Sequence, residues 1–237
     1  MKYMKDIIPG AFTLGNMFCG FLSVLFSVEG NLVTAAWLVV LAGFLDGLDG
    51  KLAQALGSTS QFGIELDSFA DVISFGLAPG VLFYSSEHII LGKWVWVLGF
   101  IFIAAGAFRL VRFNLRTEFE TKDFFNGLPI TAAAMTLASY FLFSHGVWGE
   151  MRYVGIVILI LLFFSALMVS NIKYDNLPNF SFDNQWNRIK LLYVFVGIVA
   201  ILIKPKIAPF PLGMMYVLSG VIRGINDLFS TNRIRTN

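Results

Sequence analysis

Apolar segments long enough to cross a lipid bilayer recur along the chain, and they constrain its fold more than any other feature. A membrane-spanning helix needs about 20 mainly apolar residues. The sequence offers eight candidates, of which the seventh is short, so it predicts an all-α polytopic membrane helix bundle with six to eight spans. The candidates are Pro9–Val28, Leu32–Leu56, Leu66–Tyr84, Trp94–Arg112, Leu128–Gly146, Tyr153–Asn171, Ile189–Ile203 and Ala208–Phe229.

The overall composition supports a membrane protein made of one unit. The chain is 57% hydrophobic and 14% charged, whereas soluble domains usually carry about a quarter charged residues. Its net charge of +2 is too small to indicate a nucleic-acid partner. No repeat or linker divides the sequence, so residues 1–237 are expected to form a single integral membrane domain.

Lysine and arginine residues gather in the connections on one side of the predicted bundle. The positive-inside rule assigns that side to the cytoplasm. It therefore predicts cytoplasmic N- and C-termini for a protein of the inner (cytoplasmic) membrane. The basic residues on this side are Lys2, Lys5, Arg109, Arg112, Arg116, Lys122, Lys173, Arg188, Lys190, Arg233 and Arg235.

Four aspartates interrupt the apolar pattern between the second and third candidate spans. Asp46 and Asp49 are three residues apart, and Asp67 and Asp71 are four apart, so each pair shares one helix face. A Gly- and Ser-rich turn separates the pairs, which predicts an antiparallel hairpin within residues 32–84 that directs both pairs toward each other. Asp46 would lie roughly 15 Å below the turn, at 1.5 Å of rise per residue.

Carboxylates at this depth need a positive partner. An unpaired charge inside the bilayer costs at least a few kcal/mol, and four carboxylates also repel one another. Ligand sets made only of oxygen suit hard divalent ions such as Mg²⁺, Mn²⁺ or Ca²⁺. Because Mg²⁺ usually completes its coordination with water and substrate phosphate, the cluster predicts a phosphate-bearing substrate on the cytoplasmic face.

An ion-coupled transporter is the main alternative from another functional class. Transporters also bury acidic residues along ion paths, often near the bilayer midplane and between inverted repeats. Here all four aspartates lie within 26 residues on one hairpin near one face, and the sequence shows no repeat. The pattern therefore favours an enzyme.

The stretch from Asp46 to Asp71 resembles the signature of the CDP-alcohol phosphotransferases. That family has D-x-x-D-G-x-x-A-R, about eight residues, and then G-x-x-x-D-x-x-x-D. This chain reads DGLDGKLAQ, eight residues, and then GIELDSFAD. Gln54 stands where the family usually has an arginine that helps to hold the phosphates of the CDP-lipid. Glutamine donates hydrogen bonds but carries no charge, so this departure affects substrate binding and not the acidic residues.

Four further segments resemble the bacterial serine-using members of the family, the CDP-diacylglycerol–serine O-phosphatidyltransferases. The resemblance implies metal-dependent transfer of a phosphatidyl group from CDP-diacylglycerol to the hydroxyl of L-serine, with phosphatidylserine and CMP as products. Glycerol 3-phosphate or inositol phosphate as the acceptor is the alternative within the family. The resemblance also implies a homodimer. The segments are LDSFADVISFGLAP, FRLVRFNL, FNGLPITAAA and LMVSNIKY.

The resemblance assigns roles to individual residues. It implies two divalent cations, Mg²⁺ or Mn²⁺ with Ca²⁺ as an inhibitory substitute, held by Asp46, Asp49, Asp67 and Asp71. Asp71 would also be the general base. The implied CDP-lipid contacts are Thr13, Asn16, Gly50, Ala53, Gln54 and Ser60.

Arg109 and Arg112 end the fourth candidate span, and Asn114 follows them. A guanidinium group suits a carboxylate or a phosphate, so these residues are candidates to bind serine or phosphate. The alternative from spacing alone is that the arginines only reach the membrane interface and fix the topology. The resemblance favours the substrate role.

Overall fold

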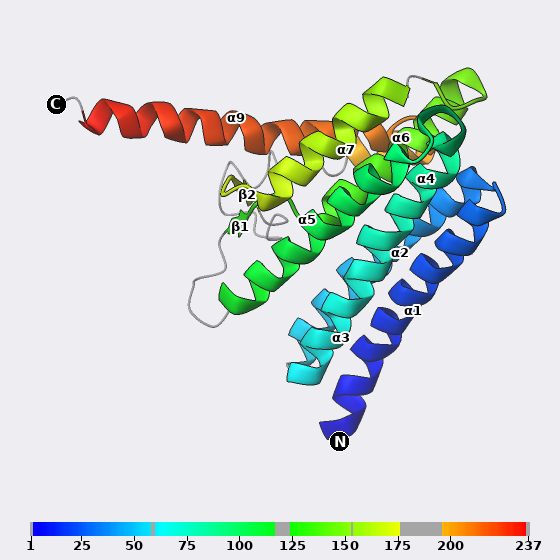
Figure 1. Ribbon diagram of the computed structural model, residues 1–237. Helices are drawn as coiled ribbons and strands as arrows, with labels where there is room; N and C mark the ends of the chain where they lie inside the picture. The colour runs from blue at the N-terminus through cyan, green and yellow to red at the C-terminus, as the bar shows by residue number, and fades with distance from the viewer. Residues whose placement is uncertain (1, 58–59, 117–123, 153, 176–195, 236–237) are drawn as a thin grey trace.

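The computed structural model describes residues 2–57, 60–116, 124–152, 154–175 and 196–235, and it is a helical bundle (Figure 1). The expected all-α membrane fold is confirmed. The helices are α1 (Lys2–Val28), α2 (Leu32–Leu56), α3 (Gln61–Asp71), α4 (Ala78–Leu91), α5 (Trp94–Arg116), α6 (Ile130–Trp148), α7 (Val154–Val169) and α9 (Pro209–Arg235), and residues 196–203 are also helical.

Fewer helices than expected are long and apolar enough to span a membrane. Among the described residues there are five: Ile8–Val28, Leu32–Leu56, Gln61–Ser86, Trp94–Leu115 and Ile130–Trp148. Helix α7 is strongly apolar but has only 16 residues. The seventh candidate lies partly outside the described residues. Helix α9 corresponds to the eighth candidate span, but the second half of its sequence is polar. Figure 1 shows α9 steeply inclined to α1–α5.

Two caps fix the turn between the helices that carry the aspartates. Gly57 adopts a left-handed conformation (φ 62°) and its N–H donates to the carbonyls of Ala53 and Gln54, which ends α2. Ser60 caps the start of α3, where its hydroxyl oxygen accepts from the N–H of Gly63 at 3.1 Å. These caps account for the end of α2 and the beginning of α3 on either side of the predicted turn.

The third span contains a wider turn directly after Asp71. Residues Val72–Leu77 form the π-helix η1, which continues into α4. Pro79 lies at the start of α4, where it lacks an N–H and its ring crowds the carbonyl four residues earlier, so a regular α-turn is disfavoured. π-turns of this kind are frequent at functional sites.

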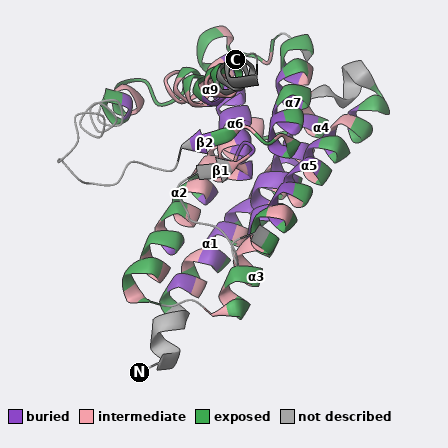
Figure 2. Cartoon of the chain, turned by 90° about the vertical axis from the view of Figure 1, so that its left-hand side faces the viewer, coloured by how far each residue is buried: buried purple, intermediate pink, exposed green. Residues whose placement is uncertain are grey.

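Helix α6 is the central helix of the bundle. It contacts α2, α9 and α7, and eleven of its residues are buried. Figure 2 shows buried residues along the middle of the bundle and exposed residues on the outer faces of the helices. Large apolar side chains on those faces, such as Phe18 (58% exposed), Phe44 (63%) and Phe100 (67%), are suited to contact lipid.

A small two-stranded sheet, which the sequence did not predict, lies beside the bundle. Strand β1 (Phe124–Asn126) precedes α6 and pairs antiparallel with β2 (Lys173–Asp175), which follows α7. Tyr174 of β2 is buried, and its hydroxyl donates to the carbonyl of Val217 on α9 at 3.4 Å. Burial, together with the neighbouring Tyr216, raises the pKa of Tyr174, so the phenol remains a neutral donor.

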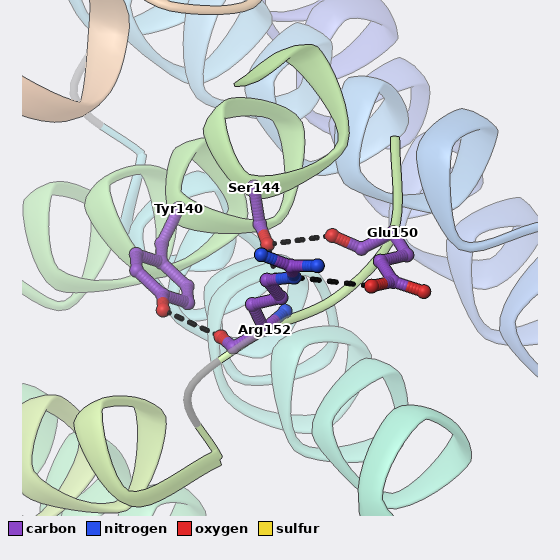
Figure 3. A network of polar contacts seen from close by, with 4 residues as sticks. All are labelled: Tyr140, Ser144, Glu150 and Arg152. Carbon is purple, nitrogen blue, oxygen red and sulfur yellow. Dashed lines mark hydrogen bonds and ion pairs between the residues drawn. The ribbon is translucent and has the colours of Figure 1, made fainter. Parts of the chain in front are cut away.

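A polar network closes the turn between α6 and α7 (Figure 3). The Ser144 hydroxyl donates to the carbonyl of Glu150 and accepts from the N–H of Arg152, both at 2.9 Å. The Tyr140 hydroxyl donates to the carbonyl of Arg152 at 2.8 Å. These contacts lie at the end of α6 that is remote from the aspartates.

Candidate active site

The aspartates of the hairpin converge, as their spacing predicted. Asp46, Asp49 and Asp67 each offer a carboxylate oxygen, and these three oxygens lie within 4.8 Å of one another. Asp71 is within hydrogen-bonding reach of Asp46. Asp49 and Asp71 are buried, and Asp46 and Asp67 are partly buried. The second and third spans therefore gather four acidic side chains in one place, which we call the aspartate cluster.

The aspartate cluster leaves buried oxygens without donors. Asp49 Oδ2, Asp67 Oδ1 and Asp71 Oδ1 are buried and accept no hydrogen bond in the described part of the chain. Buried polar atoms in proteins are almost always satisfied, and close carboxylates repel unless a cation lies between them. An all-oxygen donor set with unsatisfied, converging carboxylates fits a hard divalent cation.

Two neighbouring hydroxyl groups contact the cluster. Thr131, in the first turn of α6, donates its hydroxyl to Asp46 Oδ2 at 3.2 Å. Thr13 of α1 is buried, its hydroxyl donates to the carbonyl of Pro9 at 3.1 Å, and it also lies within hydrogen-bonding reach of Asp49. Helices α1 and α6 thus flank the hairpin, and the Thr131 hydroxyl orients the Asp46 carboxylate.

Arg109 of α5 provides a buried positive charge beside the cluster. Its side chain is 6% exposed, and its electrostatic neighbours include Asp71, Asp46 and Tyr216 of α9. The guanidinium group also lies over the ring of Phe113, 5.3 Å from the ring centroid. One guanidinium does not balance four carboxylates, so the need for a bound cation remains.

The other two candidates on α5 lie in different surroundings. Asn114 donates from Nδ2 to Ser68 Oγ at 2.8 Å, which ties the end of α5 to the helix that carries Asp67 and Asp71. Arg112 instead directs its guanidinium to the end of α7 and to Asn126. Arg109 and Asn114 are therefore brought to the hairpin, whereas Arg112 is engaged elsewhere.

The small residues of α2 divide into two groups. Side-chain carbons added at Gly47 and Gly50 would meet nothing within 4 Å, so this part of α2 presents open surface next to the aspartates. A side chain at Gly43 would collide with Met135, so that glycine serves the packing of α2 on α6. The open surface allows a bulky phosphate-bearing group to approach the backbone.

The remaining CDP-lipid candidates surround this open surface. Ala53 is partly exposed and Gln54 is exposed on α2, and Ser60 lies across the turn. The oxygen of Ser60 accepts the capping hydrogen bond from Gly63, which leaves its O–H available as a donor. Asn16 of α1 is fully buried, and both polar atoms of its amide have no hydrogen-bond partner among the described residues.

Sequence reasoning missed two residues that contact the site. Thr131 lies in the FNGLPITAAA segment, which carried a family resemblance but no assigned side chain. Ser68 lies between Asp67 and Asp71 and accepts from Asn114. A signal for Thr131 was its position one residue after the start of a span, where a hydroxyl can reach a neighbouring helix.

One apolar hollow is separate from the aspartate cluster. It is an open apolar groove of about 580 Å³ between α5 and α7, and it includes none of the aspartates. Because its lining offers almost no polar atoms for a headgroup, we assign the chemistry to the aspartate cluster.

A helical membrane bundle with carboxylates gathered beside open glycine surface is suited to hold divalent cations and a phosphate-bearing substrate. A profile of the CDP-alcohol phosphatidyltransferase family matches residues 6–167. The chain belongs to this family. The match includes the four aspartates, Arg109 and Asn114 of α5, and Thr131 of α6.

Individual relatives extend the similarity toward the C-terminus. The chain is 35% identical over 224 residues to a CDP-diacylglycerol–serine O-phosphatidyltransferase of Helicobacter pylori, covering 92% of this chain and 91% of that protein. It is 37% identical over 170 residues to an archaetidylserine synthase of Methanothermobacter thermautotrophicus, covering 70% and 69%. A Bacillus subtilis CDP-diacylglycerol–serine O-phosphatidyltransferase aligns over 77% of this chain and 99% of its own length.

Proposed function

We propose that this chain transfers a phosphatidyl group from CDP-diacylglycerol to the hydroxyl of L-serine, giving phosphatidylserine and CMP. Relatives named for transfer to serine, among them one aligned over 92% of the chain, support serine as the acceptor. The observation that carries the proposal is the convergence of the four aspartates, three of which have a buried oxygen with no donor among the described residues.

Asp46, Asp49, Asp67 and Asp71 would hold the divalent cations, which we take to be two Mg²⁺ or Mn²⁺ ions, with Ca²⁺ as an inhibitory substitute. When bound, such cations neutralise the carboxylates and stabilise negative charge on the pyrophosphate of the CDP-lipid. The hydroxyl of Thr131 holds Asp46 in place for this role.

Asp71 is the general base of the proposed reaction. Its buried Oδ1 has no donor in the described part of the chain, so it is available to accept the proton of the serine hydroxyl. The serine oxygen forms a bond to the phosphorus nearer the lipid, and the bond between that phosphorus and the bridging oxygen breaks. CMP leaves with the bridging oxygen. Positioning and charge stabilisation do most of the work in phosphoryl transfer.

The chain's other residues bind and orient the two substrates. Thr13, Asn16, Gly50, Ala53, Gln54 and Ser60 form the proposed CDP-lipid contacts. Arg109 binds the serine carboxylate, because its buried guanidinium interacts electrostatically with the base. Asn114, tied to Ser68, completes the serine side of the site.

The proposal places the hairpin 32–84 at the cytoplasmic face of the inner membrane, in a single domain of residues 1–237 with both termini in the cytoplasm. The basic residues near the ends of α5 and α7 support this orientation under the positive-inside rule. The acyl chains of the substrate remain in the bilayer, and the working protein is a homodimer.

The test is acceptor-dependent release of CMP from CDP-diacylglycerol by the purified full chain in mixed micelles with Mn²⁺ or Mg²⁺. We expect L-serine to drive the release and to yield phosphatidylserine. Release driven by glycerol 3-phosphate or inositol phosphate, with no response to serine, would overturn the choice of acceptor. An ion-coupled transporter would release no CMP with any acceptor.

A further inference from the structure

The guanidinium group of Arg112 is surrounded by acceptors from two distant segments of the chain. Its Nη1 donates to the carbonyl of Val169 at 2.8 Å and to Asn171 Oδ1 at 3.4 Å. Its Nη2 lies within hydrogen-bonding distance of three carbonyls, those of Asn126 (2.9 Å), Ser170 (2.9 Å) and Met168 (3.1 Å).

These contacts use the hydrogen atoms of both terminal nitrogens. Each terminal nitrogen of a guanidinium carries two hydrogens, and here two acceptors share those of Nη1 and three share those of Nη2. Bidentate hydrogen bonding to a carboxylate or phosphate needs at least one terminal nitrogen with a hydrogen that is not already donated. In this arrangement Arg112 therefore cannot bind a substrate in the bidentate mode.

The acceptors on α7 explain why an arginine suits this position. Met168 and Val169 are the last residues of α7, and Ser170 follows. The final carbonyls of a helix have no partner within the helix, and the helix dipole concentrates negative charge there. The Arg112 guanidinium supplies both the missing donors and the opposite charge.

The remaining acceptor, the carbonyl of Asn126, connects Arg112 to the segment that leads into α6. Asn126 precedes Gly127, whose N–H donates to the carbonyl of Ile172 at 2.8 Å, and the N–H of Leu128 donates to the carbonyl of Leu167 at 3.1 Å. Gly127 has a φ of 82°, and a side chain there would collide with the Arg112 guanidinium. The approach of Arg112 therefore depends on a glycine at this turn.

Two of the segments that Arg112 joins, α5 and the start of α6, carry residues that face the aspartate cluster. Arg109 lies one helical turn earlier on α5, and Asn114 lies two residues later. Thr131, which donates to Asp46, lies shortly after Leu128. Movement of α5 relative to α6 and α7 would therefore displace Arg109 and Thr131 from the carboxylates they face.

We propose that Arg112 is a positioning residue: it fastens the end of α5 to the end of α7 and to the start of α6, and so holds Arg109 and Thr131 at the aspartate cluster. It binds neither serine nor the CDP-lipid. The kinetic part of this inference rests on the proposed serine phosphatidyltransferase activity. An assay of serine-dependent CMP release by the wild-type chain tests that activity separately. The structural part is independent of that activity.

The first experiment measures thermal unfolding of the full chain in detergent without substrate. Arg112→Gln leaves several carbonyls without donors, and we expect its Tm to fall by about 5 °C or more. Arg112→Lys, which keeps the charge but fewer donors, should fall by less. Arg152→Gln is the matched control: its only described side-chain contact is with Glu150, both side chains are largely exposed, and its Tm should stay within about 1 °C.

The second experiment is a double-mutant cycle on kcat/KM for serine at saturating CDP-diacylglycerol, using Arg112→Lys and Arg109→Lys. If Arg112 acts through Arg109, Arg112→Lys lowers kcat/KM about tenfold in the wild-type background and much less beside Arg109→Lys. Independent binding of serine by Arg112 would make the two effects multiply.

The Tm and kinetic results together either support or overturn the positioning role of Arg112. An unchanged Tm for Arg112→Gln and Arg112→Lys overturns the proposal, and so do multiplying effects in the cycle. A lowered Tm together with coupled kinetic effects supports it. If Arg112→Gln does not fold, Arg112→Lys decides through the same two measurements. Absence of serine-dependent turnover in the wild type refutes the proposed function and leaves the Tm test of the fastening role in place.

Discussion

Two polar clusters lie at opposite ends of α6, and they differ in how their hydrogen bonds are satisfied. At the α6–α7 turn, the buried hydroxyls of Tyr140 and Ser144 both have partners within the chain (Figure 3). At the aspartate cluster, three buried carboxylate oxygens have none among the described residues. The first cluster is complete and structural, whereas the second leaves oxygens that a bound cation could satisfy.

The two clusters also differ in how their charged side chains are exposed. Glu150 and Arg152 form an exposed ion pair at 3.0 Å, of a kind that contributes little to stability. The aspartates are partly or wholly buried beside the buried Arg109. Charge that is costly to bury persists where it performs chemistry. Four substitutions test this contrast, and they follow in order of decreasing effect on turnover.

Asp71→Asn should cause the largest loss. The amide keeps the shape of the side chain but cannot accept the proton of serine, so we expect kcat to fall about 10³-fold. Because a buried repulsive charge is removed, the Tm of the substrate-free chain should not decrease. CMP release and thermal unfolding measure the two effects. A variant with wild-type kcat would exclude Asp71 as the base.

Thr131→Val removes the hydroxyl that donates to Asp46 and keeps the shape of the side chain. Loss of such a supporting hydrogen bond at a metal site typically costs about 10-fold in metal affinity or activity. The metal concentration that gives half-maximal activity should rise accordingly. Thr131→Ser, which retains the hydroxyl, is the control and should behave nearly as wild type; equal losses in both variants would contradict the role of the hydrogen bond.

Gln54→Arg should produce a gain. Gln54 is exposed beside the open surface of α2 and occupies the position where the family usually has arginine. A charge-assisted hydrogen bond to phosphate in place of a neutral one should lower the KM for CDP-diacylglycerol about fivefold. The KM for serine should not change. An unchanged or higher KM for the lipid would show that residue 54 does not reach its phosphates.

Ser144→Ala should leave turnover unchanged, because it alters only the complete cluster at the α6–α7 turn. It removes the partner of the Glu150 carbonyl and of the Arg152 N–H, so we expect unfolding to become easier by about 1–2 kcal/mol. Denaturation and CMP release measured on the same preparation test both statements. A large loss of turnover at unchanged stability would break the division between the two clusters.

The sequence predicted those features that depend on neighbouring residues. The spacing of Asp46, Asp49, Asp67 and Asp71 predicted two acidic helix faces, and the Gly- and Ser-rich turn predicted that they meet. Gly57 and Ser60 now account for the ends of the helices. Periodicity and capping are local properties, which is why the hairpin was accessible from the sequence.

Contacts between segments that are distant in the chain could not be predicted from the sequence. The contacts of Arg112 with Asn126 and Ser170 span 14 and 58 residues, and Thr131 reaches Asp46 across 85. The β1–β2 pair joins two three-residue strands that are too short to produce a pattern. Gly43 and Gly50 look alike in sequence, and only packing distinguishes the glycine against Met135 from the one beside open space.

Binding of Mn²⁺ to the substrate-free chain shows whether the aspartate cluster holds divalent cations. Electron paramagnetic resonance of free Mn²⁺ measures how much metal the protein removes from solution. We expect the wild type to bind Mn²⁺ saturably. Asp46→Asn and Asp67→Asn should each weaken Mn²⁺ binding at least tenfold, and Ser144→Ala should bind Mn²⁺ as the wild type does. No saturable binding, or equal binding by all four proteins, would contradict cation binding by the aspartate cluster.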